Sequence, residues 1–431
     1  MPFRIALSGL NAASSDLKVT GNNIANASTN GFKSSRAEFA DVYATSLGGV
    51  SNTAVGGGVR LAQVSQQFAQ GNIEFTNNNL DLAISGEGFY VLDDNGTRVF
   101  TRAGAFSVDR DGFVVNSTGQ RLQVFQPIGS SSTAFNTGSL ENLRISLTEG
   151  APNPTANVET SLNLDASDTT AGAVAAFDRT DPNTYNYSTS YTIYDSLGAQ
   201  HTATMYFLKD NATANTWHTW LYADDGSGAL QPIDPGTGNA IVGPPAVPAY
   251  STLTFATNGS LSLVNGGAPT SLTYNDLAMT NGAAPLSLDL EFSGITQFGG
   301  DYAVNSLFQD GYATGRLTGL DLSDTGVVSA RYTNGQSTAL GKVALANFPN
   351  SQGLRQMGDT AWAETFSSGG ALVGEAGTAS FGLIQSGALE ASNVDIAEQL
   401  INLITAQRNF QANSQVISTA DRITQTIINI R

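Results

Sequence analysis

The first apolar pattern in the chain has the spacing of a helix. Between residues 3 and 24, apolar side chains recur at intervals of three, four or seven residues, which places them on one face. This face carries Phe3, Leu7, Leu10, Ala13, Leu17 and Ile24. The Asn-rich segment that contains Gly31 ends the predicted helix, because Asn and Gly tolerate the left-handed conformation that closes helices.

The next pattern is the alternation typical of strands. From residue 32 to about residue 79 the periodicity is weak, and glycines indicate loops. Residues 80 to 127 then form short alternating runs: LDLAISG, GFYVLD, TRVFTR, AFSVD, FVVN and RLQVF. Asn95-Gly96 and Asp111-Gly112 separate some of these runs and supply the positive φ angles of hairpin turns. This part of the chain is predicted to be a β meander.

A second β-rich region follows. Residues 145 to 290 are rich in Ala, Ser, Thr, Asn and Gly and contain the strand candidates YSTSYTIYD, QHTATMYFL, TWHTWLYA, STLTFAT and LSLDLEF. We interpret them as a separate β domain. Residues 291 to 380 return to short strands, namely GRLTGLDLS, VVSARYT and GKVALANF.

The last forty or so residues again have helical spacing. Ser392, with Asp395 three positions later, forms an N-terminal capping signal. One apolar stripe contains Ile396, Leu400, Leu403, Phe410 and Ile417, and a second, rotated stripe contains Val416, Ala420, Ile423, Ile427 and Ile430. A continuous helix here would be about 57 Å long, which is more than a small domain can cover.

Two interpretations of the terminal helices fit this pattern. They could pack on each other or on the β domains as ordinary core helices. Alternatively, their stripes could be buried against other copies of the chain, as in coiled coils. The polar face of the C-terminal helix favours the second interpretation, because it consists mainly of Asn and Gln rather than charged residues.

Composition removes several functional classes. The 431 residues carry a formal net charge of -17, which disfavours binding to nucleic acid. The absence of cysteine excludes disulfides, thiolate metal sites and cysteine nucleophiles. No apolar run approaches the roughly 18 residues of a membrane span, so we expect no membrane insertion. The start, MPFRIALSGL, is too short and polar for a cleaved signal peptide, so the protein either stays in the cytoplasm or leaves by a route that reads an uncleaved N-terminus.

The candidates for catalysis and metal binding are weak. The segment DRDG at residues 109–112 begins like a calcium loop but lacks the later ligands, so a hairpin turn is favoured. The acidic pairs at 93–94 and 224–225 lie beside glycines and are interpreted as turns. His201 and His218 lie in strand-like runs and are interpreted as packing or surface residues. With no GxSxG, P-loop or GxGxxG motif, we expect no enzyme, no cofactor and no metal.

Both ends of the chain resemble the axial proteins of the bacterial flagellum, a family of rod, hook and hook-associated proteins. The N-terminal similarity lies in ALSGLNAASSDLKVTGNNIANASTNGFKSSRAEF, residues 6–39. The C-terminal similarity lies in SGALEASNVDIAEQLINLITAQRNFQANSQVISTADRI, residues 386–423. Between them, LDLAISGEGFYVL and FTRAGAFSVDRDGFVVN also resemble the family. The matching residues of the N-terminal motif are Asn23, Asn26, Gly31, Phe32 and Lys33.

This resemblance implies a mainly β fold with α-helical termini. The N- and C-terminal helices would pair as an antiparallel coiled coil lining the channel of a tube, with β domains inserted between them. The expected domains are an inner helical domain at 1–26 and 393–431, an extended connecting region at 27–79 and 381–392, a proximal β domain at 80–145 and 291–380, and an outer β domain at 146–290. The assembly residues would then be Phe3, Leu7, Leu10, Leu17 and Ile24 at the N-terminus and Ile396, Leu400, Leu403, Phe410, Ile417, Ile423 and Ile427 at the C-terminus.

Within the family, the length and the segments YDSLGAQHTATMYF and GRLTGLDLSDTGVVSARYTNGQ resemble the hook subunits. The implied function is that of a structural subunit that polymerises into a flexible tube, a universal joint that transmits motor torque from rod to filament. A distal rod or hook-associated protein is one alternative. From a different class, the alternative is a secreted β-rich adhesin or carbohydrate-active protein.

The resemblance also implies partners and a location. The partners would be other copies of the chain, the distal rod protein, the hook cap protein, the first hook-associated protein, the type III export apparatus and the hook-length control protein. The location would be the hook of the extracellular flagellum, reached without a cleaved signal peptide.

Overall fold

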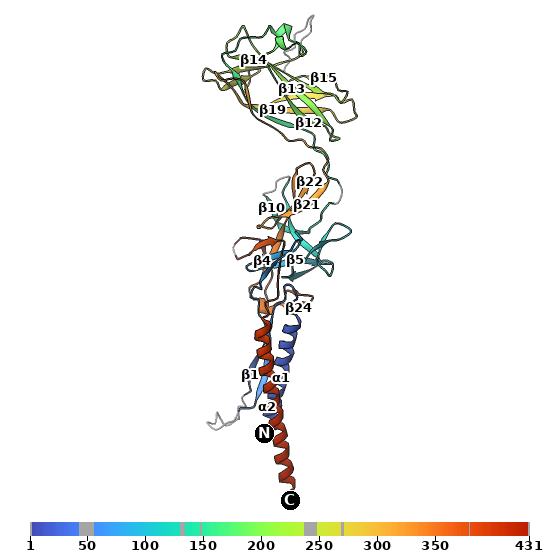
Figure 1. Ribbon diagram of the computed structural model, residues 1–431, viewed down its shortest axis with the longest axis vertical. Helices are drawn as coiled ribbons and strands as arrows, with labels where there is room; N and C mark the ends of the chain where they lie inside the picture. Colours follow the sequence, from blue (N-terminus) through green and yellow to red (C-terminus); the bar gives the residue numbers. More distant parts are fainter. Residues whose placement is uncertain are drawn as a thin grey trace. The chain divides into compact units, whose positions relative to one another are not determined.

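The computed structural model describes residues 2–42, 56–129, 134–146, 149–236, 248–268, 271–378 and 380–429; for Pro2, Asp276, Ile427 and Asn429 it describes the backbone only. The chain divides into two compact units (Figure 1). Unit 1 comprises Met1–Leu147, Thr318–Arg331 and Ser337–Arg431, and unit 2 comprises Thr148–Leu317 and Tyr332–Gln336. Both chain ends therefore belong to the same unit.

The two terminal helices of unit 1 pack side by side and antiparallel (Figure 1). Helix α1 spans Pro2–Ala25 and helix α2 spans Ile396–Asn429. Near one end of the pair, Asn23 Nδ2 donates a hydrogen bond of 3.1 Å to Gln399 Oε1. Near the other end, Gly9 lies against the side chain of Asn413. These contacts confirm the antiparallel pair predicted from the two ends of the sequence.

The seam between the helices follows a heptad spacing. The more buried positions of α2 are separated alternately by four and three residues, as in coiled coils. They are Gln399, Leu403, Ala406, Phe410, Asn413, Ile417 and Ala420. In α1, Ala6, Ala13 and Thr20 are buried one heptad apart. Because many of these residues are small, the two helix backbones can approach closely.

The beginning of α2 corrects one detail of the sequence prediction. The helix begins at Ile396, and its N-cap is Asp395 rather than Ser392. Asp395 Oδ1 accepts hydrogen bonds from the backbone N–H groups of Ala397, at 2.8 Å, and Glu398, at 3.2 Å. This is the usual geometry of an N-cap carboxylate, which satisfies N–H groups that lack helical partners. The predicted segment was right, but the capping residue lies three positions later.

An antiparallel strand pair lies beside α1. Strands β1 (Ser35–Asp41) and β2 (Val59–Gln66) occupy a region where the sequence pattern predicted loops. The sequence pattern did not reveal these strands because most of their side chains are exposed or only half-buried, so that no clear apolar alternation marks them. Glycines 56–58, which indicated a loop, lie outside both strands.

The main sheet of unit 1 joins strands from distant parts of the sequence. Its path is β21-β22-β23-β9-β5-β6-β25-β24, with β7, β8, β10 and β26 paired at its sides. The bounds are β5 Phe89–Asp94, β6 Thr97–Thr101, β7 Ser107–Val108, β8 Val114–Val115, β9 Arg121–Pro127, β10 Phe135–Asn142, β21 Leu317–Leu322, β22 Val327–Tyr332, β23 Ser337–Asn347, β24 Arg355–Gly358, β25 Ala361–Ala363 and β26 Leu372–Glu375. A short 3-10 helix, Ser351–Gly353, follows β23.

Strand pairings in three sheets join the C-terminal part of unit 1 to its N-terminal part. In the main sheet, β23 pairs with β5 and β9, and its Leu345 lies opposite Tyr90. Two smaller pairs repeat this closure: β27 (Leu383–Ser386) with β4 (Leu82–Ser85), and β28 (Ala388–Glu390) with β3 (Ile73–Phe75). The chain therefore returns beside its own outgoing segment before it enters α2.

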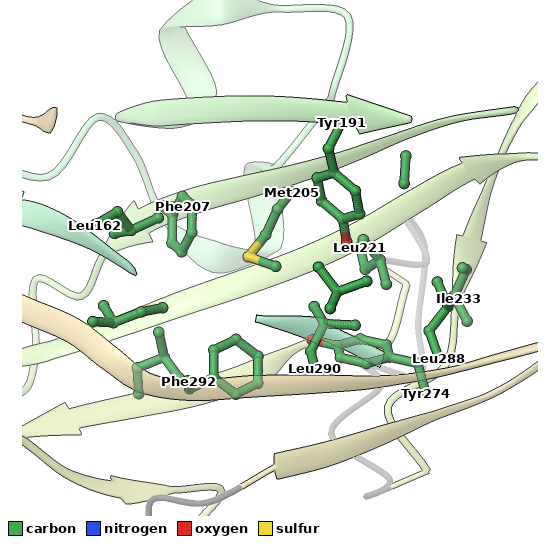
Figure 2. Close-up of a cluster of buried hydrophobic side chains, with 14 of the residues drawn as sticks. Leu162, Tyr191, Met205, Phe207, Leu221, Ile233, Tyr274, Leu288, Leu290 and Phe292 are labelled. Carbon is green, nitrogen blue, oxygen red and sulfur yellow. The ribbon is translucent and has the colours of Figure 1, made fainter. Parts of the chain in front are cut away.

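Unit 2 is built from two sheets that share one core. The first has the order β12-β13-β14-β16-β17, with β15 paired to β14, and the second has the order β18-β19-β11-β20. The bounds are β11 Asn157–Asp165, β12 Tyr187–Tyr194, β13 Gln200–Lys209, β14 Thr216–Asp224, β15 Leu230–Ile233, β16 Ser251–Phe255, β17 Leu261–Val264, β18 Ser271–Leu277, β19 Leu286–Phe298 and β20 Ala303–Gln309, with 3-10 helices at Val174–Ala176 and Pro182–Thr184. Figure 2 shows Met205 and Phe207 of the first sheet near Phe292 of the second, as in a β-sandwich.

The expected outer limit at residue 290 falls inside strand β19, and unit 2 instead continues to Leu317. Beyond residue 290, β19 still places Phe292 and Ile295 in the core of this unit. The run LSLDLEF, residues 286–292, was the last strand candidate of the predicted outer domain. In the structure, Gly294 lies within the strand, where an added Cβ would come within 2.9 Å of Ser161 Cβ. The glycine permits close strand packing rather than a turn.

We expect that replacing Gly9 with leucine weakens the helix pair. An added Cβ at Gly9 would lie 2.5 Å from Asn413 Oδ1, so a leucine there must displace the Asn413 side chain from the seam. Gly21 is the matched control, because nothing lies within 4 Å of its Cβ position. Both changes raise intrinsic helix propensity by up to about 1 kcal/mol. Amide hydrogen exchange of α1 and α2 should be faster in Gly9→Leu and not faster in Gly21→Leu; equal protection would argue against close contact at Gly9.

Candidate assembly site

The predicted assembly residues of the two helices divide between the seam and the outer surface. Leu10, Leu17 and Ile24 of α1 are half-buried, as are Leu403, Phe410 and Ile417 of α2. The remaining predicted residues with described side chains are exposed: Phe3, Leu7, Ile396, Leu400 and Ile423. The side chain of Ile427 lies outside the described residues. The apolar stripes predicted from the sequence are thus only partly buried within one chain.

Large apolar residues remain uncovered on the outside of the helix pair. Besides those just named, the exposed set contains Ile5, Ile401, Ile404, Val416 and Ile428. A groove of about 700 Å³ lies where α1 begins, between Phe3 and the segment of α2 around Val416 and Ile423. Its lining is mainly apolar, which is typical of a surface that another chain covers.

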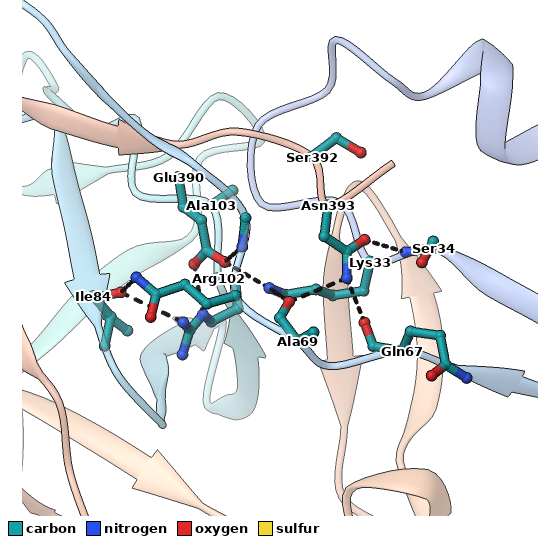
Figure 3. Close-up of polar contacts among 12 residues, drawn as sticks. Lys33, Ser34, Gln67, Ala69, Ile84, Arg102, Ala103, Glu390, Ser392 and Asn393 are labelled. Atoms are coloured by element: carbon teal, nitrogen blue, oxygen red, sulfur yellow. Dashed lines mark hydrogen bonds and ion pairs between the residues drawn. The ribbon is translucent and has the colours of Figure 1, made fainter. Parts of the chain in front are cut away.

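A buried ion cluster lies where the two ends of the chain meet the β part of unit 1 (Figure 3). Glu390 accepts a hydrogen bond of 2.6 Å from Lys33 Nζ through Oε1 and one of 2.8 Å from Arg102 Nε through Oε2. The Glu390 side chain has no solvent exposure. One carboxylate therefore connects the segment after α1, the segment after β6 and the end of β28.

Backbone groups satisfy the remaining polar atoms of this cluster. Lys33 Nζ also donates to the carbonyl of Ala69 at 2.7 Å, and Glu390 Oε1 accepts from the N–H of Gly71 at 2.8 Å. The Arg102 guanidinium donates to the carbonyls of Gly86 and Gly88. Burial lowers the pKa of Lys33, and the neighbouring Glu390 carboxylate opposes that shift. The pairing is what makes buried charge tolerable at this position.

Residues of the N-terminal motif hold the backbone around the cluster. Gly31 has a φ of 69°, and an added Cβ would lie 2.5 Å from the backbone nitrogen of Ala103, so only glycine fits. The side chain of Asn23 bonds both backbone groups of Ser35, at 2.8 and 2.9 Å. Asn26 caps the end of α1 by donating to the carbonyl of Asn22. Phe32, between Gly31 and Lys33 in the sequence, is half-buried.

Sequence reasoning missed three residues of this junction: Arg102, Glu390 and Asn393. Asn393 Oδ1 accepts from the N–H of Ser34 at 2.7 Å, and its Nδ2 donates to the carbonyl of Gln67 at 2.7 Å. The one sequence signal that pointed to this junction was the charge of Lys33 and Glu390. Lys33 and Glu390 stand among mainly neutral residues in the two terminal motifs, as a pair of opposite charges at opposite ends of the sequence.

The weak candidates for catalysis have structural roles. Asp109 Oδ1 accepts from the N–H groups of Asp111 and Phe113 in the turn of the β7–β8 hairpin. Asp225 likewise accepts from the N–H of Ser227. His201 is buried in unit 2, with Nε2 3.0 Å from Asp195 Oδ2. Within the described ranges, acidic and histidine side chains form no group of three or more that could hold a metal ion. Among the helices described, none combines the length and apolar character needed to cross a membrane.

We expect Glu390→Gln to destabilise unit 1 by about 3–5 kcal/mol, because it leaves Lys33 and Arg102 buried without their counter-charge. Glu375→Gln is the control. Glu375 forms a 2.6 Å ion pair with Lys342, but both side chains are partly exposed, so the cost should stay near or below about 1 kcal/mol. Amide hydrogen exchange of β4 to β6 at increasing urea concentrations measures the change in the free energy of unfolding of unit 1. Exchange of unit 2, which neither change should affect, is the internal reference. A similar small loss in both variants would contradict a central role for Glu390.

Models of flagellar protein families match four segments of the chain. The "Flagella basal body rod protein" model matches residues 3–33, and the "Flagellar hook protein FlgE/F/G D1 domain" model matches residues 83–159. The "Flagellar basal body protein FlaE D2 domain" model matches residues 163–312, and the "Flagellar basal body rod FlgEFG protein C-terminal" model matches residues 385–430. The two terminal matches contain the helices and both partners of the Lys33–Glu390 pair.

The chain is similar over its whole length to flagellar hook proteins FlgE. It is 38% identical to that of Escherichia coli K12 and 36% identical to that of Salmonella typhimurium, in each case over 100% of both chains. It is 32% identical to that of Borreliella burgdorferi, over 99% of this chain and 98% of that protein. The crystal structure of Helicobacter pylori flagellar hook protein FlgE2 shares the fold, with a TM-score of 0.54 at 16% identity over 74% of this chain and 100% of that chain. On these full-length similarities, the chain belongs to the flagellar hook protein FlgE family of structural hook subunits.

Proposed function

We propose that copies of this chain polymerise into the flexible tube of the hook, with the paired terminal helices lining its channel. The observation that carries the proposal is the uncovered apolar surface of the helix pair in a full-length relative of hook subunits. Burying a single Leu or Ile side chain contributes about 1.5–3 kcal/mol. Each subunit exposes several such residues to water, so their burial between subunits would favour association.

The mechanism divides mechanical roles within the chain. The Lys33–Glu390–Arg102 cluster joins the segments that connect α1 and α2 to the β part of unit 1. Torque applied to the helices would therefore pass to the β part of unit 1. Unit 2 has its own core and carries many exposed Ser, Thr and Asn side chains. Polar contacts between outer units can break and re-form more easily than a sealed apolar interface. Such contacts suit a universal joint that bends while it rotates.

The proposed partners follow from this role. Within the flagellum, the tube would contact the distal rod protein at one end and the first hook-associated protein at the other, and grow beneath a hook cap protein. The type III export apparatus would deliver each subunit outside the cell without a cleaved signal peptide, under the control of the hook-length control protein.

The adhesin or carbohydrate-active alternative finds little support in unit 2. That alternative calls for aromatic side chains lining an open cleft. The main aromatic cluster instead stacks Phe177 on Trp220, with ring centroids 3.8 Å apart, and both residues are buried. These rings stabilise the sheet from within and present little surface to a sugar.

We expect the double change Ile401→Asn with Ile404→Asn to block polymerisation while the subunit stays folded. Both isoleucines are exposed in the single chain, so their loss costs the monomer little. The matched control is Gln407→Asn with Gln411→Asn, two exposed polar positions on the same helix. The critical concentration, measured by sedimentation with electron microscopy of the pellet, should rise at least about tenfold, or about 1.4 kcal/mol, in the isoleucine variant alone. An unchanged value would place this surface outside the subunit contacts.

Removal of most of unit 2 should leave a chain that still forms tubes, but straighter ones. The structure sets the limits of such a deletion. Gly150 lies beside Gly315, with an N–H to carbonyl hydrogen bond of 2.8 Å, whereas Glu291, next to the expected outer limit at 290, pairs in the sheet with β11. Residues 151–314 can therefore be replaced by two or three glycines. Electron microscopy of curvature is the readout. Loss of polymerisation in a variant whose unit 1 retains its exchange protection would mean that unit 2 builds the wall.

A further inference from the structure

We propose that the hook subunits associate head to tail through α2, with the C-terminal end of α2 in one copy packed on the beginning of α2 in the next. The inference rests on the proposed homopolymer and specifies its contact. We define the head patch as Ile396, Leu400, Ile401 and Ile404, and the tail patch as Val416, Ile423 and Ile428. All seven side chains are exposed in the single chain.

The distribution of exposed residues along α2 carries the argument. Between the two patches, the exposed side chains are almost entirely polar: Thr405, Gln407, Arg408, Asn409, Gln411, Ala412, Ser414 and Gln415. A partner helix lying along the whole length of α2 would bury this polar middle. A partner that overlaps only one end would cover apolar surface and leave the middle in water. The pattern therefore favours contact at the ends.

The lengths of the two helices explain why Ile423 and Ile428 of the tail patch lack a partner within the chain. Helix α1 has 24 residues and α2 has 34. In the antiparallel register set by Gly9 and Asn413, α1 begins near Ala420, and the end of α2 continues past it (Figure 1). The apolar groove beside Phe3 lies at this point, continuous with the intrachain seam. A helix from a second copy would extend the seam where α1 stops.

Charge complements the apolar match. Glu398 lies in the first turn of α2 beside the head patch, and Arg422 lies beside Ile423 in the tail patch. Both side chains are exposed, and neither has an ion-pair partner among the described residues. The other acidic groups nearby are engaged: Asp395 caps α2, and Asp421 accepts from Gln425 Nε2. The helix dipole adds to the attraction, because the negative C-terminal end of one α2 approaches the positive N-terminal end of the next.

A head-to-tail contact joins two different surfaces, and this accounts for a polymer rather than a closed dimer. Head and tail are different surfaces, so each copy that binds one partner still offers a free patch at its other end. Contacts of this heterologous kind generate open helical assemblies when the rotation does not close. An antiparallel dimer could also pair head with tail twice, but it would close and stop growth. The experiment below separates the two arrangements.

A charge-reversal series tests the contact. Arg422→Glu and Glu398→Arg should each raise the critical concentration about three- to tenfold, because each brings like charges together at the contact. The double variant should return to within about twofold of the wild-type value, which two independent surface effects would not do. Arg408→Glu, in the polar middle of α2, is the matched control and should change the critical concentration less than twofold. Additive losses in the double variant would overturn the proposed pairing.

Disulfide trapping tests the geometry directly, since the natural chain has no cysteine. Polymer of the variant Leu400→Cys with Ile423→Cys should give, after oxidation, a ladder of dimers, trimers and longer products on a denaturing gel. The control pair, Gln407→Cys with Ile423→Cys, should give none. A product that stops at the dimer would indicate the closed arrangement and overturn the inference. If tubes form but neither trapping nor charge rescue occurs, the head-to-tail contact is wrong while the hook function stands; if the wild-type chain forms no tubes, the proposed function itself fails.

Discussion

The structure of unit 1 depends on one buried carboxylate. Glu390 is the last residue of the chain's return strand β28, and its two oxygens bind cations from two segments of the first quarter of the sequence, Lys33 and Arg102. Without it, two positive charges would remain in a site that water does not reach, at a cost of several kcal/mol. The cluster therefore fixes where the outgoing and returning chain meet, at the base of the antiparallel pair of α1 and α2. In the proposed torque-transmitting tube, this cluster would be the fixed joint at the base of the helices.

The helices show which features of a seam a sequence pattern reveals and which it conceals. Large apolar residues marked both helices correctly, because periodicity is a property of the local chain. The seam of α2 also passes through Gln399, Ala406 and Asn413, which are small or polar and were not marked by the pattern of large apolar residues. Meanwhile Ile396 and Leu400 look like core residues but face outward. Under the proposed assembly, apolar spacing would mark the contacts between copies as well as those within the chain, and the structure identifies the latter.

The β regions were predictable to the extent that their side chains alternate. The strands of unit 2 that cross the core, such as β13 and β14, were recognised from their apolar and aromatic residues. Strands β1, β2 and β20 were missed, since few of their side chains are buried and pairing is made by backbone groups common to every residue. The ion cluster was missed because Glu390 is hundreds of residues from Lys33 and Arg102 in the sequence. The pairing of β28 with β3 and the hydrogen bond from the Gly31 N–H to the Glu390 carbonyl bring these segments together.

The insertion of unit 2 between two paired segments of unit 1 has a physical consequence for the hook. The chain enters and leaves this unit through adjacent backbone, because Gly150 and Gly315 are hydrogen-bonded neighbours. The core of unit 2 draws its apolar residues from within the insertion, from Val158 to Ile295, so its stability does not depend on the helices. Each unit can then satisfy a different requirement: the helical end can be apolar enough to associate firmly, while the inserted sandwich keeps a polar surface. If both surfaces shared one continuous core, strain on the outer surface would be transmitted through the close-packed interior to the helical end. Two separate cores avoid this coupling.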